Sequence, residues 1–189
     1  DISASGRFDD NDGRFDDATT WRLGAGYAFD AVNGRARASV GTGVKNPTFT
    51  ELFGFFPGSF IGNPDLKPES SKGIETGLRG NFDSGSFDVA VYYNKYRDFI
   101  DEDAVAAGST VEQFQAKNIK HATIKGIEAK GRMNLDAFGA PQGLYTQGSI
   151  AYTYGRNDDN GEPLNSVNPL KGVFGLGYDQ QNYGALVSW

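Results

Sequence analysis

The 189-residue sequence contains no cysteine, one methionine and one histidine. Without cysteine, the chain cannot form a disulfide framework, a thiolate metal site or a cysteine nucleophile. A single histidine gives poor support for a serine–histidine–acid triad, and paired carboxylates occur only in predicted loops. We therefore expect no enzymatic activity and no bound cofactor.

Long hydrophobic runs are also missing. The longest uncharged stretch, residues 137–155, is interrupted by proline, glutamine and glycine, whereas a membrane-spanning helix needs ~18 or more apolar residues. The net charge of −6 and the lack of a basic patch predict no nucleic-acid partner. A mean hydropathy of −0.48 is still compatible with a transmembrane β-barrel, whose polar lumen and loops dilute its apolar band.

Alternation of apolar and polar residues fills much of the chain, and helical periodicity is scarce. Glycine accounts for 26 residues and aromatic residues for 13% of the sequence. The alternation predicts an all-β protein with about nine strands, at residues 2–8, 20–29, 34–44, 72–82, 86–97, 119–135, 143–155, 170–178 and from 183 onward.

The connections between these strands alternate in length. Short connections at residues 30–33, 83–85, 136–142 and 179–182 alternate with long ones at 9–19, 45–71, 98–118 and 156–169. This alternation predicts an antiparallel up-and-down meander with its long loops at one end. In outer-membrane barrels the short turns are periplasmic and the long loops are extracellular.

The two faces of each predicted strand differ in charge. One face is apolar and uncharged, as a lipid-facing surface requires, because a lysine or arginine there costs ~2–4 kcal/mol at the bilayer midplane. The opposite face is polar and suits a wet lumen; its charged residues are Arg22, Arg35, Arg37, Glu75, Arg79, Asp88, Glu128, Lys130 and Arg132. Aromatic residues flank the short turns, as in a membrane-interface girdle: Phe29, Phe82, Phe87, Phe138, Tyr145, Tyr178 and Tyr183.

Two other architectures share this alternation. A soluble β-sandwich binding module would pack the apolar faces against one another. A passive porin-like channel would use the same lumen residues, with arginines lining an open pore. Nine strands is an odd number, whereas single-chain bacterial barrels have even numbers, so we expect a piece of a larger barrel.

The second long connection carries a motif. The sequence "VKNPTFTELFGFFPGSFIGNPDLKPESSKGIETGL" resembles the TonB-dependent outer-membrane receptors, as do "NIKHATIKGIEAKGRMNL" and "PLNSVNPLKGVFGLGY" further along. The positions that carry the resemblance in the long connection are Lys45, Pro47, Glu51, Leu52, Phe53, Gly62, Asn63, Pro64, Leu66, Pro68, Glu69, Ser70, Glu75 and Gly77. Most of these residues are expected to shape the loop rather than to touch a ligand.

The resemblance implies a transmembrane barrel of about 22 strands with a plugged lumen. Residues 1–189 would be a late part of this barrel, with the plug and the final strands outside them. It also implies a bacterial outer-membrane location among lipids and lipopolysaccharide. Uptake of a scarce iron complex would draw energy from a TonB-type inner-membrane transducer acting through the plug.

Two features of the motif loop have a physical interpretation of their own. Pro64 and Pro68 fix their own φ and restrict the residues before them, which predicts a stiff extended strut that Leu66 can attach to the barrel rim. Five phenylalanines lie within 12 residues, and an exposed apolar patch of this kind marks a binding surface. These ligand-facing candidates are Phe49, Phe53, Phe55, Phe56 and Phe60.

The sequence leaves the ligand open. Haem receptors often carry a histidine within this loop, but none lies between Pro47 and Asn63. His121, at the predicted start of a strand, is a weak candidate haem ligand. A ferric siderophore or haem is the first expectation, and cobalamin is the next, because "YYNKYRDFIDED" resembles the vitamin B12 receptors.

Overall fold

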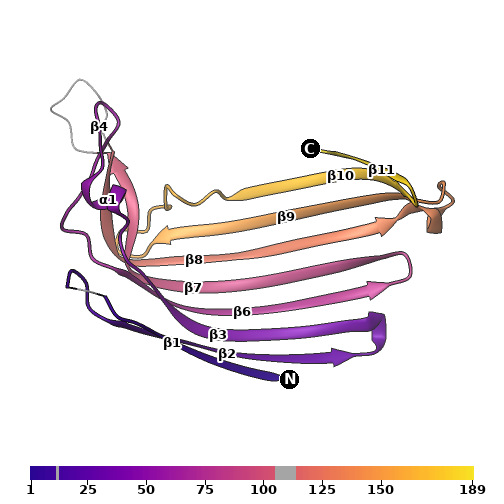
Figure 1. Cartoon of the computed structure of the whole chain (residues 1–189), viewed down its shortest axis with the longest axis horizontal. Coiled ribbons are helices and arrows are strands. Elements are labelled where there is room, and N and C mark those ends of the chain that lie inside the picture. The colour runs from indigo at the N-terminus through magenta and orange to yellow at the C-terminus, as the bar shows by residue number, and fades with distance from the viewer. Residues whose placement is uncertain (12, 105–113) are drawn as a thin grey trace.

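The computed structural model describes residues 1–11, 13–104 and 114–189. They form one antiparallel sheet in which neighbouring strands follow one another along the chain (Figure 1). The strands along this path are β1 (Ile2–Asp9), β2 (Ala18–Phe29), β3 (Gly34–Lys45), β6 (Glu69–Phe82), β7 (Gly85–Ala104), β8 (Phe114–Asn134), β9 (Leu144–Asn157), β10 (Leu170–Gln180) and β11 (Tyr183–Ser188). The predicted all-β, up-and-down antiparallel meander is confirmed.

Several elements were not predicted. The connection after β3 holds a helix, α1 (Phe49–Phe53), and two short strands, β4 (Phe55–Phe56) and β5 (Phe60–Ile61). Two of the short connections contain single 3-10 turns, η1 (Ala31–Asn33) and η2 (Leu135–Phe138). Strands β7 and β8 also continue into the connection predicted over 98–118, the middle of which lies outside the described residues.

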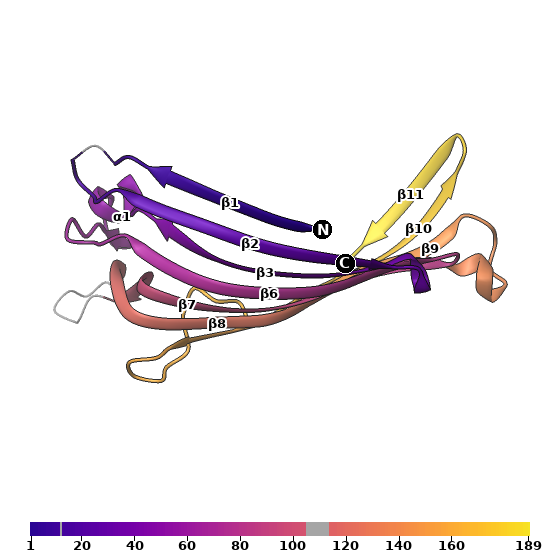
Figure 2. The same cartoon turned by 90° about the horizontal axis from the view of Figure 1, so that it is seen from below.

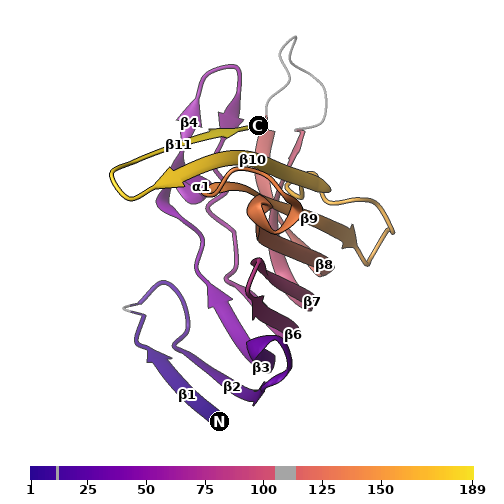
Figure 3. The same ribbon diagram turned by 90° about the vertical axis from the view of Figure 1, so that its right-hand side faces the viewer.

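The sheet is twisted and curved. Figures 2 and 3 show that it bends into an open trough, with β1 and β11 at its two edges. At the long-loop end, β7 and β8 bend away from the other strands (Figure 1). Within β7, Asp98 has a φ of 52°, in the left-handed region that few non-glycine residues adopt. Among the described residues, no helix is long and apolar enough to cross a membrane.

The apolar face of the sheet is bare from edge to edge. Ile74 on β6, Ile127 on β8 and Ile150 on β9 expose 56%, 45% and 54% of their surface, although they lie in the middle of the sheet. A β-sandwich would cover such side chains with a second sheet, and the described residues form only one. The sandwich interpretation is therefore wrong for this chain.

Glycines on the polar face leave space for side chains that pair across an intervening strand. Next-nearest strands lie ~10 Å apart, twice the ordinary strand spacing, yet Arg37 on β3 donates to Asp88 on β7 across 2.8 Å. Its guanidinium lies over Gly77 of β6, where a Cβ would come within 2.6 Å of the Arg37 Cζ. Charged residues can therefore pair across an intervening strand because a glycine leaves the space.

Tyr92 and Thr153 repeat this arrangement. Their hydroxyl oxygens are 2.8 Å apart, one on β7 and the other on β9, and Gly126 of β8 lies beneath the tyrosine ring. Arg35 of β3 likewise pairs with Asp1 over Gly26 of β2. The high glycine content of the chain thus serves contacts across the polar face as well as turns.

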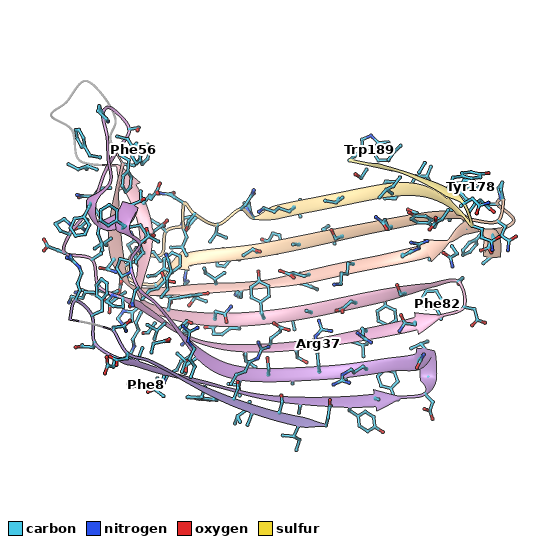
Figure 4. The ribbon with its side chains drawn as sticks, in the orientation of Figure 1. Phe8, Arg37, Phe56, Phe82, Tyr178 and Trp189 are labelled. Carbon is cyan, nitrogen blue, oxygen red and sulfur yellow. The ribbon has the colours of Figure 1, made fainter. Side chains whose placement is uncertain are left out.

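Aromatic residues gather at the short-turn end. Phe82 and Tyr178, labelled in Figure 4, lie at the end of the sheet opposite Phe8 and Phe56. Tyr178 and Tyr183 flank the β10–β11 turn with ring centroids 6.2 Å apart. This height along the strands corresponds to the aromatic girdle expected at a membrane interface. Tyr145 does not belong to it, because it is buried on the polar face against Arg132.

Buried apolar side chains concentrate instead at the long-loop rim. One cluster contains Leu52, Leu66, Ile100 and Ala116. A second contains Phe99, Ala122 and Leu164. Both buried clusters found in the described part of the chain therefore lie where the loops fold over the ends of the strands.

Candidate ligand-binding site at the long-loop rim

The five candidate phenylalanines lie on one segment of the long-loop rim, and we call them the phenylalanine crest (Phe49, Phe53, Phe55, Phe56 and Phe60). Four of them are exposed, by 77%, 48%, 64% and 53% in chain order, while Phe60 is half-buried. Phe49 and Phe53 are four residues apart on α1, so their rings meet with centroids 5.3 Å apart. The structure brings all five onto α1, β4 and β5, above the rim (Figures 1 and 4).

A capping box starts α1. The Thr48 hydroxyl accepts from the Glu51 amide at 3.2 Å, and the Glu51 carboxylate accepts from the Thr48 amide at 2.6 Å. These bonds satisfy two amides that a helix start leaves without partners. Lys45 also pairs with Glu51 at 3.2 Å. Partial burial of Glu51 raises its pKa, but these hydrogen bonds outweigh burial, so the pKa lies below its ordinary value.

The β4–β5 hairpin attaches the crest to the barrel wall. Phe56 pairs with Phe60 across the hairpin, whose turn contains Gly58 at a φ of 77°. Strand β5 in turn pairs with β8 in parallel, with Phe60 opposite Phe114. The crest is therefore hydrogen-bonded to the extended part of a wall strand.

The proline segment of residues 63–68, which we continue to call the strut, lies across the same rim. It is not extended throughout as predicted, because Pro64 and Asp65 form a turn in which the Leu66 amide donates to the Asn63 carbonyl at 3.4 Å. Leu66 is only 4% exposed and packs with Leu52, Ile100 and Ala116. The Asn63 side chain donates to the Ala116 carbonyl at 3.0 Å, and its oxygen accepts from the Asp65 amide at 3.0 Å. The strut is thus held by one apolar anchor, Leu66, and by hydrogen bonds between the Asn63 side chain and backbone groups.

Asn118 on β8 secures the end of the strut. Its side chain accepts from the Lys67 amide at 2.8 Å and donates to the Lys67 carbonyl at 3.0 Å. The same amide group donates to the Asp98 carbonyl at 2.7 Å. One asparagine therefore joins the strut to Asp98 of β7.

Arg14, in the first long loop, is hydrogen-bonded to the strut. It donates to the Pro64 carbonyl at 2.6 Å, and its guanidinium carbon lies 4.9 Å from the centroid of the Phe53 ring. The neighbouring Asn46 donates to the Asn11 side chain at 2.9 Å. The sequence analysis did not identify Arg14; the only local signal is an arginine within the acidic run "DDNDGRFDD".

The other motif residues separate into two groups. Pro47 is buried beside α1, and Glu69 accepts from the Ile100 amide at 3.1 Å, so both belong to the rim. Glu75 and Gly77 lie on the polar face of β6, where Glu75 is 3.8 Å from Arg37. These last two residues belong to the wall and not to the crest.

His121 belongs to a different loop contact. Its Nδ1 lies 2.9 Å from Asp159, in the connection after β9, and its backbone amide donates to the same carboxylate at 3.1 Å. It was predicted at the start of a strand, but β8 begins earlier, at Phe114. The β7–β8 pairing continues past the predicted boundary because Ile100 and Asn118 remain opposite each other.

The carboxylates beside His121 are both stabilised as anions. The Thr123 hydroxyl donates to Asp158 at 2.6 Å, which lowers the pKa of that carboxyl, and Arg156 lowers it further. The hydrogen bond to His121 lowers the pKa of Asp159. Among the described residues, no cluster of three or more His, Cys, Asp or Glu side chains could hold a metal ion.

Sequence comparisons identify a family and several similar proteins. The family model for the TonB-dependent receptor-like β-barrel matches residues 1–189. The hemoglobin-haptoglobin utilization protein B of Neisseria meningitidis is 33% identical over 166 residues, which cover 75% of this chain and 20% of that protein. The vitamin B12 transporter BtuB of Vibrio vulnificus is 42% identical over 120 residues, which cover 63% of this chain and 18% of that protein.

Solved structures share the fold. The copper transporter OprC superposes with a TM-score of 0.75 at 24% identity, covering 92% of this chain and 26% of that one. A ferric enterobactin receptor from Pseudomonas aeruginosa gives a TM-score of 0.71 at 19% identity, covering 100% and 30%. At these identities the likeness shows the fold alone.

The chain spans about a fifth of the length of the curated relatives it matches. The family model nevertheless extends over all of it, and the single curved sheet with its bare apolar face has the form that a barrel wall requires. This chain belongs to the TonB-dependent receptor family, as a part of its β-barrel.

Proposed function

We propose that this chain is part of the barrel of a bacterial outer-membrane receptor that binds a ferric siderophore or haem. The plug and the final strands would lie in the remainder of the protein. A TonB-type inner-membrane transducer would supply energy through the plug. The receptor would carry out no covalent chemistry, because its work is differential binding of one ligand by two conformations.

One observation carries this proposal. Four exposed phenylalanines stand on a rim that is clamped by Leu66, Arg14 and Asn118. Exposed apolar surface on a rigid support favours binding, because little conformational entropy is lost when the ligand docks. Flat aromatic rings suit a catecholate siderophore or a macrocycle equally well.

A second candidate ligand is cobalamin. Among the relatives given above, the vitamin B12 transporter of Vibrio vulnificus has the higher identity, 42% against 33%. The macrocycle of cobalamin could use the same crest. Ligand class therefore has to be decided by binding measurements.

The test uses the full-length protein in detergent or in outer membranes. Ferric enterobactin, haemin and cyanocobalamin would each be titrated against the wild type and against Phe55→Ala/Phe56→Ala. We expect saturable binding of one ligand class and an affinity about tenfold weaker in the double variant, because aromatic anchors dominate such surfaces. Phe138→Ala is the matched control, since Phe138 is 71% exposed but lies on η2 beside a short turn.

A passive channel is the contrary outcome. No binding of any of the three ligands, together with ion conductance of the full-length protein in planar bilayers, would reject the receptor and favour the porin-like alternative. If Phe138→Ala weakened ligand binding as much as the double variant does, the crest would not be the ligand-binding site.

A further inference from the structure

The apolar face of the wall ends in positive charge at the long-loop end. Along β7 the exposed side chains alternate from Tyr93 directly into Lys95 and Arg97, so these two cations share the apolar face. The register places Lys72 of β6 opposite Lys95 and Lys125 of β8 opposite Tyr93. We call Lys72, Lys95, Arg97 and Lys125 the outer basic patch; all four are exposed.

The outer basic patch lies one apolar band away from the aromatic girdle at the short turns. Lys72 and Phe82 are ten residues apart on the same face of β6, which corresponds to ~34 Å along a strand. Strands of outer-membrane barrels tilt by ~35–45°, so the two residues differ in height by ~24–28 Å, close to the ~25 Å of an apolar band. With the girdle at one membrane interface, the patch is therefore level with the lipid headgroups at the other.

The positive charge of this patch is not compensated within the described part of the chain. Lys72 and Lys95 face each other directly across β6 and β7, and like charges in this arrangement destabilise a sheet. No carboxylate there lies within salt-bridge distance of any of the four residues. Asp158, the carboxylate on which Lys95 acts from further away, is already held by Thr123 at 2.6 Å and by Arg156 at 3.0 Å. The patch therefore has room for an external anion.

Aromatic side chains accompany these cations. The Lys125 Nζ lies 5.4 Å from the centroid of the Tyr154 ring, and Tyr93 lies beside Lys125 in the register. Tyrosine rings are enriched where a membrane meets water, and lysine can lay its apolar stem along such a surface while its ammonium group reaches the headgroups. This combination suits a lipid headgroup better than an anion free in solution.

The size and position of the patch indicate the class of lipid. Its cations lie on three neighbouring strands, which span ~10 Å, and lysine and arginine both bind phosphate oxygens well. A phospholipid headgroup carries a single phosphate, whereas lipopolysaccharide carries several phosphate groups on one headgroup with several acyl chains. Long loops of outer-membrane barrels are extracellular, so the patch would lie in the leaflet that contains lipopolysaccharide.

We propose that the outer basic patch binds the phosphate groups of a lipopolysaccharide molecule whose acyl chains lie on the apolar face below it. This inference rests on the proposed function, because it needs the barrel to stand in an outer membrane with its long loops outside. A phosphate group between Lys72 and Lys95 would replace their repulsion with two charge-assisted contacts. Arg97 and Lys125 would contact further phosphate oxygens.

The experiment titrates fluorescently labelled lipopolysaccharide against the full-length protein in detergent. In the Lys72→Gln/Lys95→Gln/Lys125→Gln variant the affinity should fall about tenfold or more, because each cation near a lipid headgroup adds to the attraction. The Lys72→Arg/Lys95→Arg/Lys125→Arg variant keeps the charge and should bind within about threefold of the wild type. Its binding separates loss of charge from damage to the fold.

A matched control removes the same charge from the other face. Arg79, Lys130 and Lys171 lie on the polar face in register with Asp88, Asp88 and Ala151. Arg79→Gln/Lys130→Gln/Lys171→Gln therefore changes the net charge equally without touching the patch. Its affinity for lipopolysaccharide should not change.

Three outcomes would overturn the proposal. The first is unchanged affinity in the variant with three glutamines at the patch. The second is an equal loss in the polar-face control, which would make the attraction one of net charge alone. The third is displacement of lipopolysaccharide by phosphatidylglycerol or inorganic phosphate at the same concentration as by unlabelled lipopolysaccharide, which would make the patch a general anion surface.

The proposed receptor function is tested separately in the same samples. Binding of ferric enterobactin, haemin or cyanocobalamin that persists while the patch variants show no effect would reject the lipid site alone. Absence of binding of all three, together with the expected loss of lipopolysaccharide affinity at the patch, would reject the receptor function and leave the lipid site.

Discussion

The long-loop rim and the wall of this sheet differ in how far they bury apolar side chains. At the rim, seven of the nine buried hydrophobic residues among those described form two compact clusters. Along the wall, apolar residues such as Ile74 and Ile127 are about half exposed. The rim therefore buries its apolar side chains as a protein in water does, whereas the apolar face of the wall requires an apolar surrounding. A chain in water would not leave such a large apolar surface uncovered.

The largest effect that would sharpen this contrast is expected at Leu66. Leu66→Ala leaves a cavity between α1 and the β7–β8 extension and should cost about 2–5 kcal/mol in local stability. Hydrogen exchange of the Leu52 and Asn63 amides in the full-length protein would measure it. Ile74→Ala should cost less, because lipid can fill the space that the side chain leaves. Equal costs at the two positions would mean that the apolar face packs against protein.

The next effect concerns the two faces of the wall. Ile127→Arg places a cation on the apolar face and should destabilise the folded protein by about 2–4 kcal/mol in a bilayer. Ala151→Arg places the same side chain on the polar face, opposite Glu128, and should change stability by less than about 1 kcal/mol. Urea unfolding of the full-length protein in phosphatidylcholine vesicles compares them. A larger loss for Ala151→Arg would reverse our assignment of the faces.

The smallest effect is a pH dependence confined to the rim. The folded-state pKa of Glu51 is lowered from 4.5, so its contribution is present at neutral pH and is lost as pH falls below about 4.5 and through the folded pKa. The loss should be about 0.5–2 kcal/mol, as for other helix caps. Hydrogen exchange at the Leu52 amide, followed from pH 6 to pH 3, would detect it. Glu51→Gln should flatten this dependence, and an unchanged slope in that variant would assign it to another carboxylate.

The sheet itself could be predicted from the sequence because alternation is a local signal. Each wall strand has one apolar and one polar face, and both faces are visible within about ten residues. The short connections and their flanking aromatics such as Phe82 and Tyr178 follow from the same pattern. No knowledge of distant contacts was needed.

The extension of β7 and β8 could not be predicted in this way. Phe99, Ile100 and Asp101 are consecutive and all buried, because loops cover both faces of the ribbon at the rim. Burial on both sides removes the alternation by which a strand is recognised. The local sequence pattern does not predict the β5–β8 pairing or the Arg14 contact with Pro64 either, since each joins segments about 50 residues apart.

The candidate site was predicted in part. The phenylalanines and the proline strut are contiguous in sequence, so their joint location at the rim followed directly. The separation of Glu75 and Gly77 from that rim depends on β6 running down the wall, and the pairing of His121 with Asp159 depends on the β8–β9 register. Contacts of this second kind become visible only when the strands are aligned.

The parallel pairing of β5 with β8 has a mechanical consequence. Strand β8 runs without a break over 21 residues, a contour length of about 70 Å at ~3.4 Å per residue. A pull on the crest along this axis loads the β8 hydrogen bonds together in shear rather than opening them one after another. Force applied to the crest would therefore pass through the bend of β8 at the rim and then along one strand toward the short-turn end of the sheet.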